Sequence, residues 1–465
     1  MVANRLSMNS DRFLGQYIGI SRALYHEVRD LPLVCPHGHV DPALLSAHEV
    51  SFPDPVSLLI RPDHYLLRML YSQGLPLEFF LDEEQDPRLV WRRFAENYQL
   101  FWATPSGVWL DHQLAETFEV EQKLSGVTAD ETYDAIAAKL KQPNYRPRAL
   151  FERFNIEVLC TTDGATDSLE YHQKIRDDDW SGKVLPTFRP DKLFCFGSPQ
   201  WPQELAKLQN QVTSNVSTWK GFLDGIRERR AVFKELGCVA TDHGCEIPFT
   251  EHLTAAEAEG LFDEALRGKL PAYDHRRLEG HMLIEMAGMS CEDGLVMQLH
   301  AGSHRNHNSF VFDKFGPDKG CDIPRSVDFT HGLKPLLNAF GNDPRFRLIV
   351  FTLDESTYSR ELAPMAGHYP ALRLGPPWWF LDSLNGMKRY FDQVMETAGV
   401  YNTAGFNDDT RAFCSIPARH DMWRRAACRW LSEVVVDGLL SADQASVLAK
   451  ELAVGRARSA YRLDD

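Results

Sequence analysis

The sequence predicts an α/β protein and, within that class, a closed (β/α)₈ barrel with a helical insertion after the first strand. Three observations lead to this prediction: short apolar, β-branched runs recur eight times, helical patterns separate most of them, and each run ends in polar residues. Strands that alternate with helices favour a parallel sheet, and eight such units favour closure into a barrel. The alternative is an open, doubly wound sheet with a separate helical domain.

The candidate strands are apolar runs that stop at polar residues. In chain order they cover residues 33–39, 158–163, 184–191, 238–244, 296–302, 348–354, 372–379 and 402–409. The last run is the weakest candidate, because Gly405 interrupts it and glycine weakens the interior of a strand.

The segments between these runs carry helical periodicity. TWKGFLDGIRERRAVFKELG repeats apolar residues at helical spacing and stops at Gly237, and TAAEAEGLFDEALRG opens with Thr254 as a cap. GLKPLLNAFG, DSLNGMKRYFDQVMETAG and DMWRRAACRWLSEVV show the same pattern. These stretches are expected to be the crossover helices.

The first crossover is too long for one helix, because several helical patterns follow one another between the first two candidate strands. We expect three parts of the chain. Residues 1–56 would hold an N-terminal helix and the first barrel strand, residues 57–150 a helical insertion, and residues 151–465 the rest of the barrel with C-terminal helices.

Composition indicates a packed globular protein of the cytoplasm. Apolar residues make up 44% of the chain, no run of eighteen apolar residues could span a membrane, and the first residues lack an apolar signal core. The nine cysteines are scattered and form no C-x-x-C motif, which favours reduced thiols. A formal net charge of −15 argues against a nucleic-acid or anionic membrane partner, but local arginines could still hold a small anionic substrate.

Two histidines, His37 and His39, stand at the end of the first run in the stretch VCPHGHVDP. Side chains two residues apart on a strand face the same way, so both imidazoles could share one divalent ion such as Zn²⁺. A carboxylate ligand is also expected, and Asp408 or Asp409 lies on the last run, which neighbours the first in a closed barrel. The alternatives are a polar turn for the histidines and a helix cap or surface acid for the aspartates.

Three arginines follow other strand ends: Arg189, Arg305 and Arg411. Guanidinium groups bind carboxylates through two parallel hydrogen bonds, so three of them at one barrel mouth favour an anionic substrate. Each one alone could equally form a salt bridge within this acidic chain. His300, at the end of the fifth run, could bind metal or substrate, or could be a hydrogen-bonded core residue.

Aromatic residues could complete the wall of such a site. Tyr65 in DHYLLRML could reach the mouth and donate a proton or hydrogen bond, although an amphipathic helix that packs Tyr65 into the core is the simpler interpretation. GPPWWF contains Trp378 and Trp379, whose faces could stack on a sugar ring, although core packing is the commoner explanation.

Seven segments in a fixed order make the chain resemble the uronate isomerases, a divergent branch of the amidohydrolase superfamily. The segments are RPDHYLLRML, CTTDGATDSLEYH, LPTFRPDK, TDHG, MQLHAGSHRNHN, PPWWFLDSLNGM and NDDTRAF. Each segment alone is a modest match, whereas the ordered set is highly specific.

The resemblance implies a distorted (β/α)₈ barrel and an aldose–ketose isomerase that acts on a hexuronate. Such enzymes interconvert D-glucuronate with D-fructuronate, and D-galacturonate with D-tagaturonate. The resemblance also implies one divalent metal ion, commonly zinc, a small-molecule sugar acid as substrate, no nucleic-acid or membrane partner, and a homo-oligomer.

Residue roles follow from the matching segments. His37, His39 and Asp409 would bind the metal, since NDDTRAF selects Asp409 over Asp408. Tyr65 would line the substrate pocket. The other substrate-binding residues would be Arg189, His300, Trp379, Asp242 and Arg305.

Isomerisation through an enediol needs a base at C2, an acid for the carbonyl oxygen and stabilisation of the enediolate charge. Asp409 is the candidate base, with a metal-bound water as its rival. Tyr65 or a metal-linked water would transfer protons to and from the oxygens, and Arg411 with Arg189 would hold the carboxylate and the enediolate charge.

The chain also departs from the family pattern. The first motif usually reads H-C-H-L followed by proline, whereas this chain has HGHVDP, and SHRNHN adds His304 and His307. The segment after the sixth run keeps only the frame of its family counterpart. These changes leave the preferred sugar open.

Two other functions are possible. A metal-dependent hydrolase of the wider superfamily often has a lysine on strand four or a metal-binding histidine on strand six, whereas these runs end in Asp242-His243 and Asp354. A carbohydrate-binding barrel without activity would not need His37, His39 and Asp409.

Overall fold

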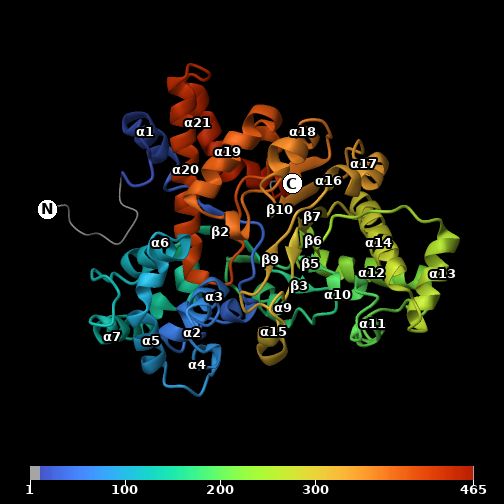
Figure 1. The fold of residues 1–465 in the computed structure, drawn as a ribbon, viewed down its shortest axis with the longest axis horizontal. Helices are drawn as coiled ribbons and strands as arrows, with labels where there is room; N and C mark the ends of the chain where they lie inside the picture. The colour runs from blue at the N-terminus through green and yellow to red at the C-terminus, as the bar shows by residue number, and fades with distance from the viewer. Residues whose placement is uncertain (1–10, 464–465) are drawn as a thin grey trace.

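The computed structural model describes residues 11–463. Strands lie at the centre and helices surround them (Figure 1). The strands are β1 (Leu33–Cys35), β2 (Ile156–Cys160), β3 (Asp163–Gly164), β4 (Lys183–Leu185), β5 (Phe188–Arg189), β6 (Ala240–Cys245), β7 (Val296–Ala301), β8 (Ser303–His304), β9 (Ile323–Pro324), β10 (Leu348–Thr352) and β11 (Leu372–Leu374).

Two parallel sheets form the wall of the central structure. One has the order β1-β2-β4 and the other β11-β10-β7-β6-β5-β3, while β8 and β9 form a separate antiparallel pair. Backbone hydrogen bonds continue from one sheet to the other, because Thr161 N donates to Leu185 O and Asp163 N to Thr187 O. β2 with β3 and β4 with β5 are therefore halves of the second and third predicted strands.

Further backbone contacts join the two ends of this wall. Leu374 of β11 forms a parallel bridge with Thr403, and His39 N donates to Thr410 O at 3.0 Å. The segment 403–410 thus lies between the last and the first strand and completes a ring. The α/β prediction is confirmed, and these contacts favour the barrel over an open sheet.

The eighth predicted strand, residues 402–409, forms only that isolated bridge and no regular strand. Gly405 has a φ of +72°, and a Cβ atom there would come within 2.6 Å of Ala457 N. The backbone turns at this glycine because it passes closely over another segment, so the hydrogen-bond ladder breaks.

A group of helices connects β1 to β2. They are α2 (Pro55–Leu59), α3 (His64–Ser72), α4 (Leu77–Leu81), α5 (Pro87–Glu96), α6 (Pro105–His112), α7 (Ala129–Leu140) and α8 (Pro147–Arg153). Their starts follow local chemistry: the Asp54 side chain accepts from Val56 N, and Pro55 occupies the first turn of α2. The predicted limits at 57 and 150 fall inside α2 and α8, and the three-part division stays a prediction.

The remaining helices include the five predicted crossovers as well as helices that those sequence patterns did not mark. They are α1 (Ile18–Val28), α9 (Glu170–Arg176), α10 (Asp191–Phe194), α11 (Trp201–Gln209), α12 (Trp219–Glu235), α13 (Ala255–Leu266), α14 (Ala272–Asp293), α15 (Ser309–Phe315), α16 (Phe329–Gly332), α17 (Lys334–Phe340), α18 (Ala363–Ala366), α19 (Leu384–Ala398), α20 (Ile416–Val436), α21 (Ala442–Lys450) and α22 (Arg456–Ala460). Thr254 caps α13 as expected and forms a capping box with Glu257. None of the helices within residues 11–463 is both long enough and apolar enough to cross a membrane.

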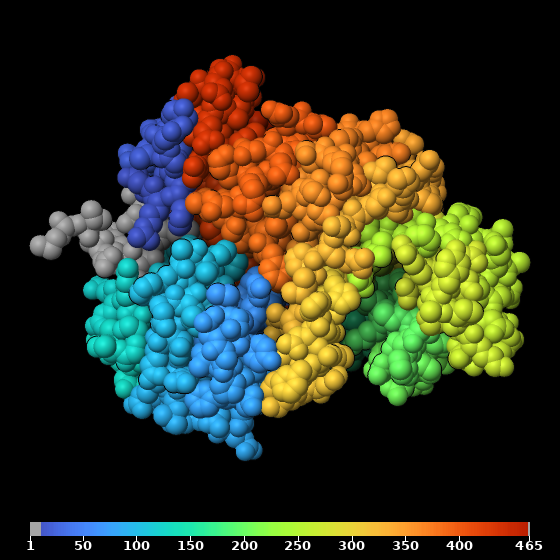
Figure 2. All heavy atoms as spheres, in the orientation of Figure 1, coloured from blue at the N-terminus to red at the C-terminus, as the bar shows by residue number. Residues whose placement is uncertain are grey.

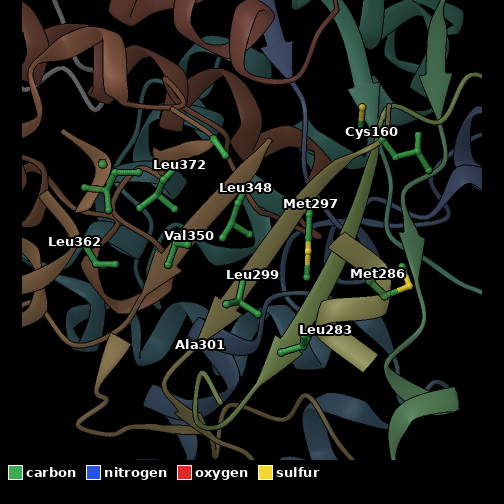
Figure 3. Close-up of a cluster of buried hydrophobic side chains, with 14 of the residues drawn as sticks. Cys160, Leu283, Met286, Met297, Leu299, Ala301, Leu348, Val350, Leu362 and Leu372 are labelled. Atoms are coloured by element: carbon green, nitrogen blue, oxygen red, sulfur yellow. The ribbon is translucent and has the colours of Figure 1, made fainter. Parts of the chain in front are cut away.

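The two faces of β7 show how the barrel is filled. Met297 and Leu299 pack in one cluster with Leu348 and Val350 of β10 and with Leu283 of α14 (Figure 3). The alternate residues point into the barrel. They are Val296, Gln298 and His300, and Gln298 Oε1 accepts a hydrogen bond from Tyr461 after α22. The outward residues of β7 therefore pack against helices, and inside the barrel Gln298 and His300 bring polar groups toward the site while Val296 packs with Ile349 and Phe351.

Candidate active site

The first two candidate ligands, His37 and His39, lie just beyond β1 and not on it. β1 ends at Cys35, because Pro36 has no N–H group to continue the ladder. The return bond from His39 N to Thr410 O holds the turn against the segment that carries Asp409. The prediction placed both imidazoles on one face of a strand. In the structure this turn, and not a strand, directs both imidazoles toward Asp409.

His37, His39 and Asp409 meet around one point. Asp409 Oδ1 lies 3.5 Å from His37 Nε2 and 3.1 Å from His39 Nε2. One ligand atom from each residue lies within 4.8 Å of the others. Asp409 has a φ of +36°, an unusual conformation for a residue other than glycine, and such backbone strain is typical of functional sites.

The donor set fits a divalent cation. Asp409 Oδ1 is buried and has no hydrogen-bond partner within residues 11–463, although two imidazole nitrogens approach it. Buried polar atoms normally have partners, and two histidines with one carboxylate form a common zinc ligand set. A cation bound between the three residues would be a partner for Asp409 Oδ1 and for the two imidazole nitrogens.

Asp408 lies in a different cluster. His420 Nε2 is 3.2 Å from Asp408 Oδ2 and 3.6 Å from Cys35 Sγ, and all three residues are buried. The structure therefore places Asp409, rather than Asp408, beside the two histidines.

A charged group lies beside this centre. Asp242 Oδ1 is 2.7 Å from His300 Nδ1, and Asp242 Oδ2 is 3.2 Å from Arg189 Nη1. Burial alone would raise the pKa of Asp242, but the charges of Arg189 and His300 hold that pKa well below its usual range. The His300 ring stacks on His37 with centroids 4.6 Å apart. Asp242 therefore fixes the orientation of His300 next to the candidate metal ligand.

Arg189 differs from the other two predicted arginines. Its Nε is 2.8 Å from Asp191 Oδ2 while its Nη1 contacts Asp242, so two carboxylates share its charge. It is thus suited to orient Asp242 and has little capacity left for a substrate carboxylate.

A cavity of about 590 Å³ opens above these buried groups. Seven of the predicted site residues line it, and three lie buried beneath it. The lining residues are His39, Tyr65, Arg189, Arg305, Trp379, Asp409 and Arg411, and the buried ones are His37, Asp242 and His300. The structure therefore brings all ten predicted residues to one place.

The mouth of the cavity carries Arg305 and Arg411. Arg411 Nη2 donates to Asp318 Oδ2 at 3.0 Å, and Arg305 Nη1 donates to Asp322 Oδ2 at 3.0 Å. The Arg305 guanidinium also lies over the Trp379 ring, 5.0 Å from its centroid. Both cations are partly exposed and each faces an aspartate.

Tyr65 lies in an aromatic wall. It stacks on His64 at 4.5 Å and meets Trp109 edge-on at 5.8 Å. Burial raises the pKa of Tyr65 well above its ordinary value, so its hydroxyl stays protonated and can donate. Tyr65 therefore packs against the core and also lines the cavity. The structure is consistent with both interpretations of the sequence, a core residue of an amphipathic helix and a donor in the site.

Sequence reasoning missed two residues of this wall. Arg419 of α20 pairs with Asp382 at 2.7 Å and lies 3.7 Å from the Trp109 centroid. Its helix shows only amphipathic periodicity, so no local signal marks it. His64 lines the cavity beside Tyr65 and stands within the quoted segment DHYLLRML, where its histidine could have been selected.

Comparisons with known proteins agree with this arrangement. The sequence profile of a family described as glucuronate isomerase matches residues 6–461. A uronate isomerase from Nostoc punctiforme is 52% identical over 455 residues, which cover 96% of each chain.

Solved structures show the same likeness. Glucuronate isomerase from Caulobacter crescentus superposes with a TM-score of 0.97 at 45% identity and covers 99% of this chain and 98% of its own. Uronate isomerase from Thermotoga maritima has a TM-score of 0.93 at 27% identity, with 98% and 99% covered.

Proposed function

This chain belongs to the glucuronate isomerase family, and we propose that it interconverts a hexuronate with its 2-keto isomer through an enediol. The observation that carries the proposal is one cavity that joins His37, His39 and Asp409 at its floor to arginines at its mouth. A sugar acid has the two matching features, a carbonyl end for chemistry and a carboxylate for binding. D-Glucuronate and D-galacturonate are the candidate substrates.

A divalent ion, which we propose is Zn²⁺, would be held by His37, His39 and Asp409. When bound, it supplies Lewis-acid stabilisation of developing negative charge. The donor set, two imidazoles and one carboxylate, carries this part of the proposal.

Asp409 is the proposed base, and a water molecule is its rival. The carboxylate takes the proton from C2 and returns it to C1, so a C2–H bond breaks and a C1–H bond forms. Tyr65 donates its hydroxyl proton to the oxygen on C1 and recovers one from the oxygen on C2. The aldehyde becomes an alcohol and the C2 alcohol becomes a ketone, with no net oxidation.

Other residues position the sugar. Arg411 at the mouth would bind the substrate carboxylate, and a remote anchor of this kind orients the reacting carbons. Trp379 lines the cavity beneath the Arg305 guanidinium and would contact the sugar with the part of its ring that stays exposed. Asp242 would hold His300 so that the imidazole hydrogen-bonds to a substrate oxygen.

The proposal extends to the setting of the enzyme. We expect a homo-oligomer in the cytoplasm, where all nine cysteines would stay free thiols, as they are in the structure. Light scattering after size-exclusion chromatography measures the first expectation, and fractionation of cells that express the chain measures the second.

The test is an assay of the metal-depleted protein and of the same protein restored with Zn²⁺. D-Glucuronate, D-galacturonate and D-glucose as an uncharged control are followed by proton NMR in D₂O. We expect metal-dependent formation of the 2-keto acid from a uronate, with deuterium exchange at C2. No turnover of either uronate by metal-replete protein would reject the proposal, and hydrolysis of a sugar lactone instead would favour the hydrolase.

A further inference from the structure

One segment, residues 303–324, crosses the mouth of the cavity. It begins with β8, continues through α15 and ends with β9, which pairs antiparallel with β8. In the space-filling view this gold segment lies beside the blue helices that follow β1 (Figure 2). Lys314 of this segment contacts Glu78 of α4 at 3.0 Å.

The cavity carries no surplus of positive charge for an anionic substrate. Its lining contains six aspartates and five lysines or arginines. All four lining arginines already have a carboxylate partner; the pairs are Arg189 with Asp191, Arg305 with Asp322, Arg411 with Asp318, and Arg419 with Asp382. A substrate carboxylate that binds an arginine must therefore share it with an aspartate or replace that aspartate.

Among these paired aspartates, Asp318 can be displaced from its arginine most easily. The Asp318 side chain is 38% exposed, whereas those of Asp322 and Asp382 are each 4% exposed. Asp322 also accepts a hydrogen bond from the backbone of Asn306 and so holds its own segment together. The pair of Asp318 with Arg411 is the more exposed one, and exposed pairs are weak.

The backbone around Asp318 suits such a movement. Asp318 has a φ of +61°, and the glycines on either side, Gly316 and Gly320, have φ values of +77° and +79°. A left-handed aspartate is less stable than a glycine in the same conformation, and glycines allow the chain to change direction. Gly316 has open space around it, whereas a Cβ at Gly320 would come within 2.6 Å of His64 O of α3, so the chain is held at Gly320 and Asp318 can shift only with the residues before it. The Asp318 side chain is partly exposed, so its carboxylate can turn away from Arg411 into solvent.

We propose that the Asp318 carboxylate occupies, on Arg411, the position that the substrate carboxylate takes, and that substrate binding displaces Asp318 from the guanidinium. This inference rests on the proposed function. Both carboxylates are planar anions that fit the same guanidinium edge, so they compete for it. Asp318 thus sets the affinity for the sugar acid and keeps Arg411 positioned while the site is free of substrate.

The test is Asp318→Asn, which keeps the size of the side chain and removes its charge. Because exposed ion pairs are worth at most about fivefold in an equilibrium constant, we expect KM for the uronate to fall by about two- to fivefold. We expect kcat to stay within about twofold, since Asp318 is not part of the proposed proton transfer.

Two control variants distinguish loss of the competing Asp318 carboxylate from a general loosening of the segment 303–324. Glu78→Gln removes the contact with Lys314 and leaves Asp318 and Arg411 in place. Asp313→Asn removes one exposed charge from the same segment. Both should keep the KM of the unaltered protein. A KM that rises or stays unchanged in Asp318→Asn, or that falls equally in Glu78→Gln, would overturn the proposal.

A binding measurement distinguishes this inference from the proposed function. Calorimetry of the metal-replete protein with D-gluconate, and with uncharged sorbitol as control, needs no turnover. Asp318→Asn should bind D-gluconate about two- to fivefold more tightly and sorbitol no better. If the protein has no isomerase activity but Asp318→Asn still binds D-gluconate more tightly, the competition for Arg411 stands and the proposed function is rejected. If the protein is active but Asp318→Asn binds D-gluconate no more tightly, the proposed function stands and the competition is rejected.

Discussion

The floor and the mouth of the cavity are built in opposite ways. At the floor, His37 and Asp242 are each 1% exposed, and ring stacking or ion pairs to several neighbours fix them. At the mouth, the Arg411 and Asp318 side chains are 39% and 38% exposed and share one contact. Groups that act on reacting carbons need fixed geometry, whereas groups that capture a substrate must exchange partners.

This difference gives the two ends separate kinetic signatures. A change at the floor should lower kcat, because it removes interactions made in the transition state. A change at the mouth should alter KM and leave kcat nearly unchanged, because it changes binding shared by substrate and transition state: loss of a binding group raises KM, and loss of a competing group lowers it. Variants at each end can break or sharpen the comparison.

The largest effect is expected for Asp409→Asn at the floor. The amide cannot accept the C2 proton, so kcat should fall by about 10³-fold or more and deuterium exchange at C2 should disappear. Circular dichroism and elemental analysis report whether the fold and the metal persist. Asp354→Asn, which changes another aspartate after a barrel strand, should remain active. Ordinary exchange in a metal-loaded Asp409→Asn protein would transfer the role of base to water.

A smaller effect is expected for Arg411→Lys at the mouth. Lysine keeps the charge but loses the two-pronged contact with a carboxylate, so KM should rise by about tenfold. Steady-state kinetics should show kcat within a fewfold of the unaltered protein. A drop in kcat as large as that of Asp409→Asn would place Arg411 at the enediolate instead and would remove the contrast between floor and mouth.

The smallest effect on activity is expected in the barrel wall, at Asp163 of β3. Burial raises its pKa to about 7, more than its bond from Thr161 lowers it. The folded state therefore keeps the proton between about pH 4 and 7, whereas the unfolded chain releases it. Stability should fall as pH rises through this window, by at most about 1.4 kcal/mol per pH unit.

Asp163→Asn removes this titration. Urea unfolding at several pH values should show a flatter dependence in the variant than in the unaltered protein, while activity stays within about twofold. Equal slopes for the two proteins would show that Asp163 is ionised in the folded state.

Much of the fold could be predicted from the sequence, because strand and helix periodicities are local. The run that became β7 alternates apolar and polar positions that face helices and barrel interior, and Thr254 marks the start of α13. The run after residue 402 could not be judged in this way. Its course depends on the close approach of Gly405 to Ala457, a contact between distant parts of the chain.

That the candidate residues gather at one cavity could be predicted from the sequence, but how they pair could not. His37, His39 and Asp409 stand at strand ends, where a barrel brings residues together, so their meeting followed from topology. The partners of Arg189 did not follow, because Asp242 lies on a neighbouring strand whose register no motif fixes. Arg419 enters from a helix whose sequence shows only that one face is buried.

The His37–Asp409 pair spans the seam between the two ends of the barrel wall, where the first strand meets the last segment. An ion bound there would cross-link residues that are far apart in the sequence. Its loss would weaken the contact between the first strand and the segment 403–410, while the other strands would keep their neighbours. Local opening in a chelated sample should begin at residues 36–39 and 403–410, visible as early hydrogen exchange at the His39 amide.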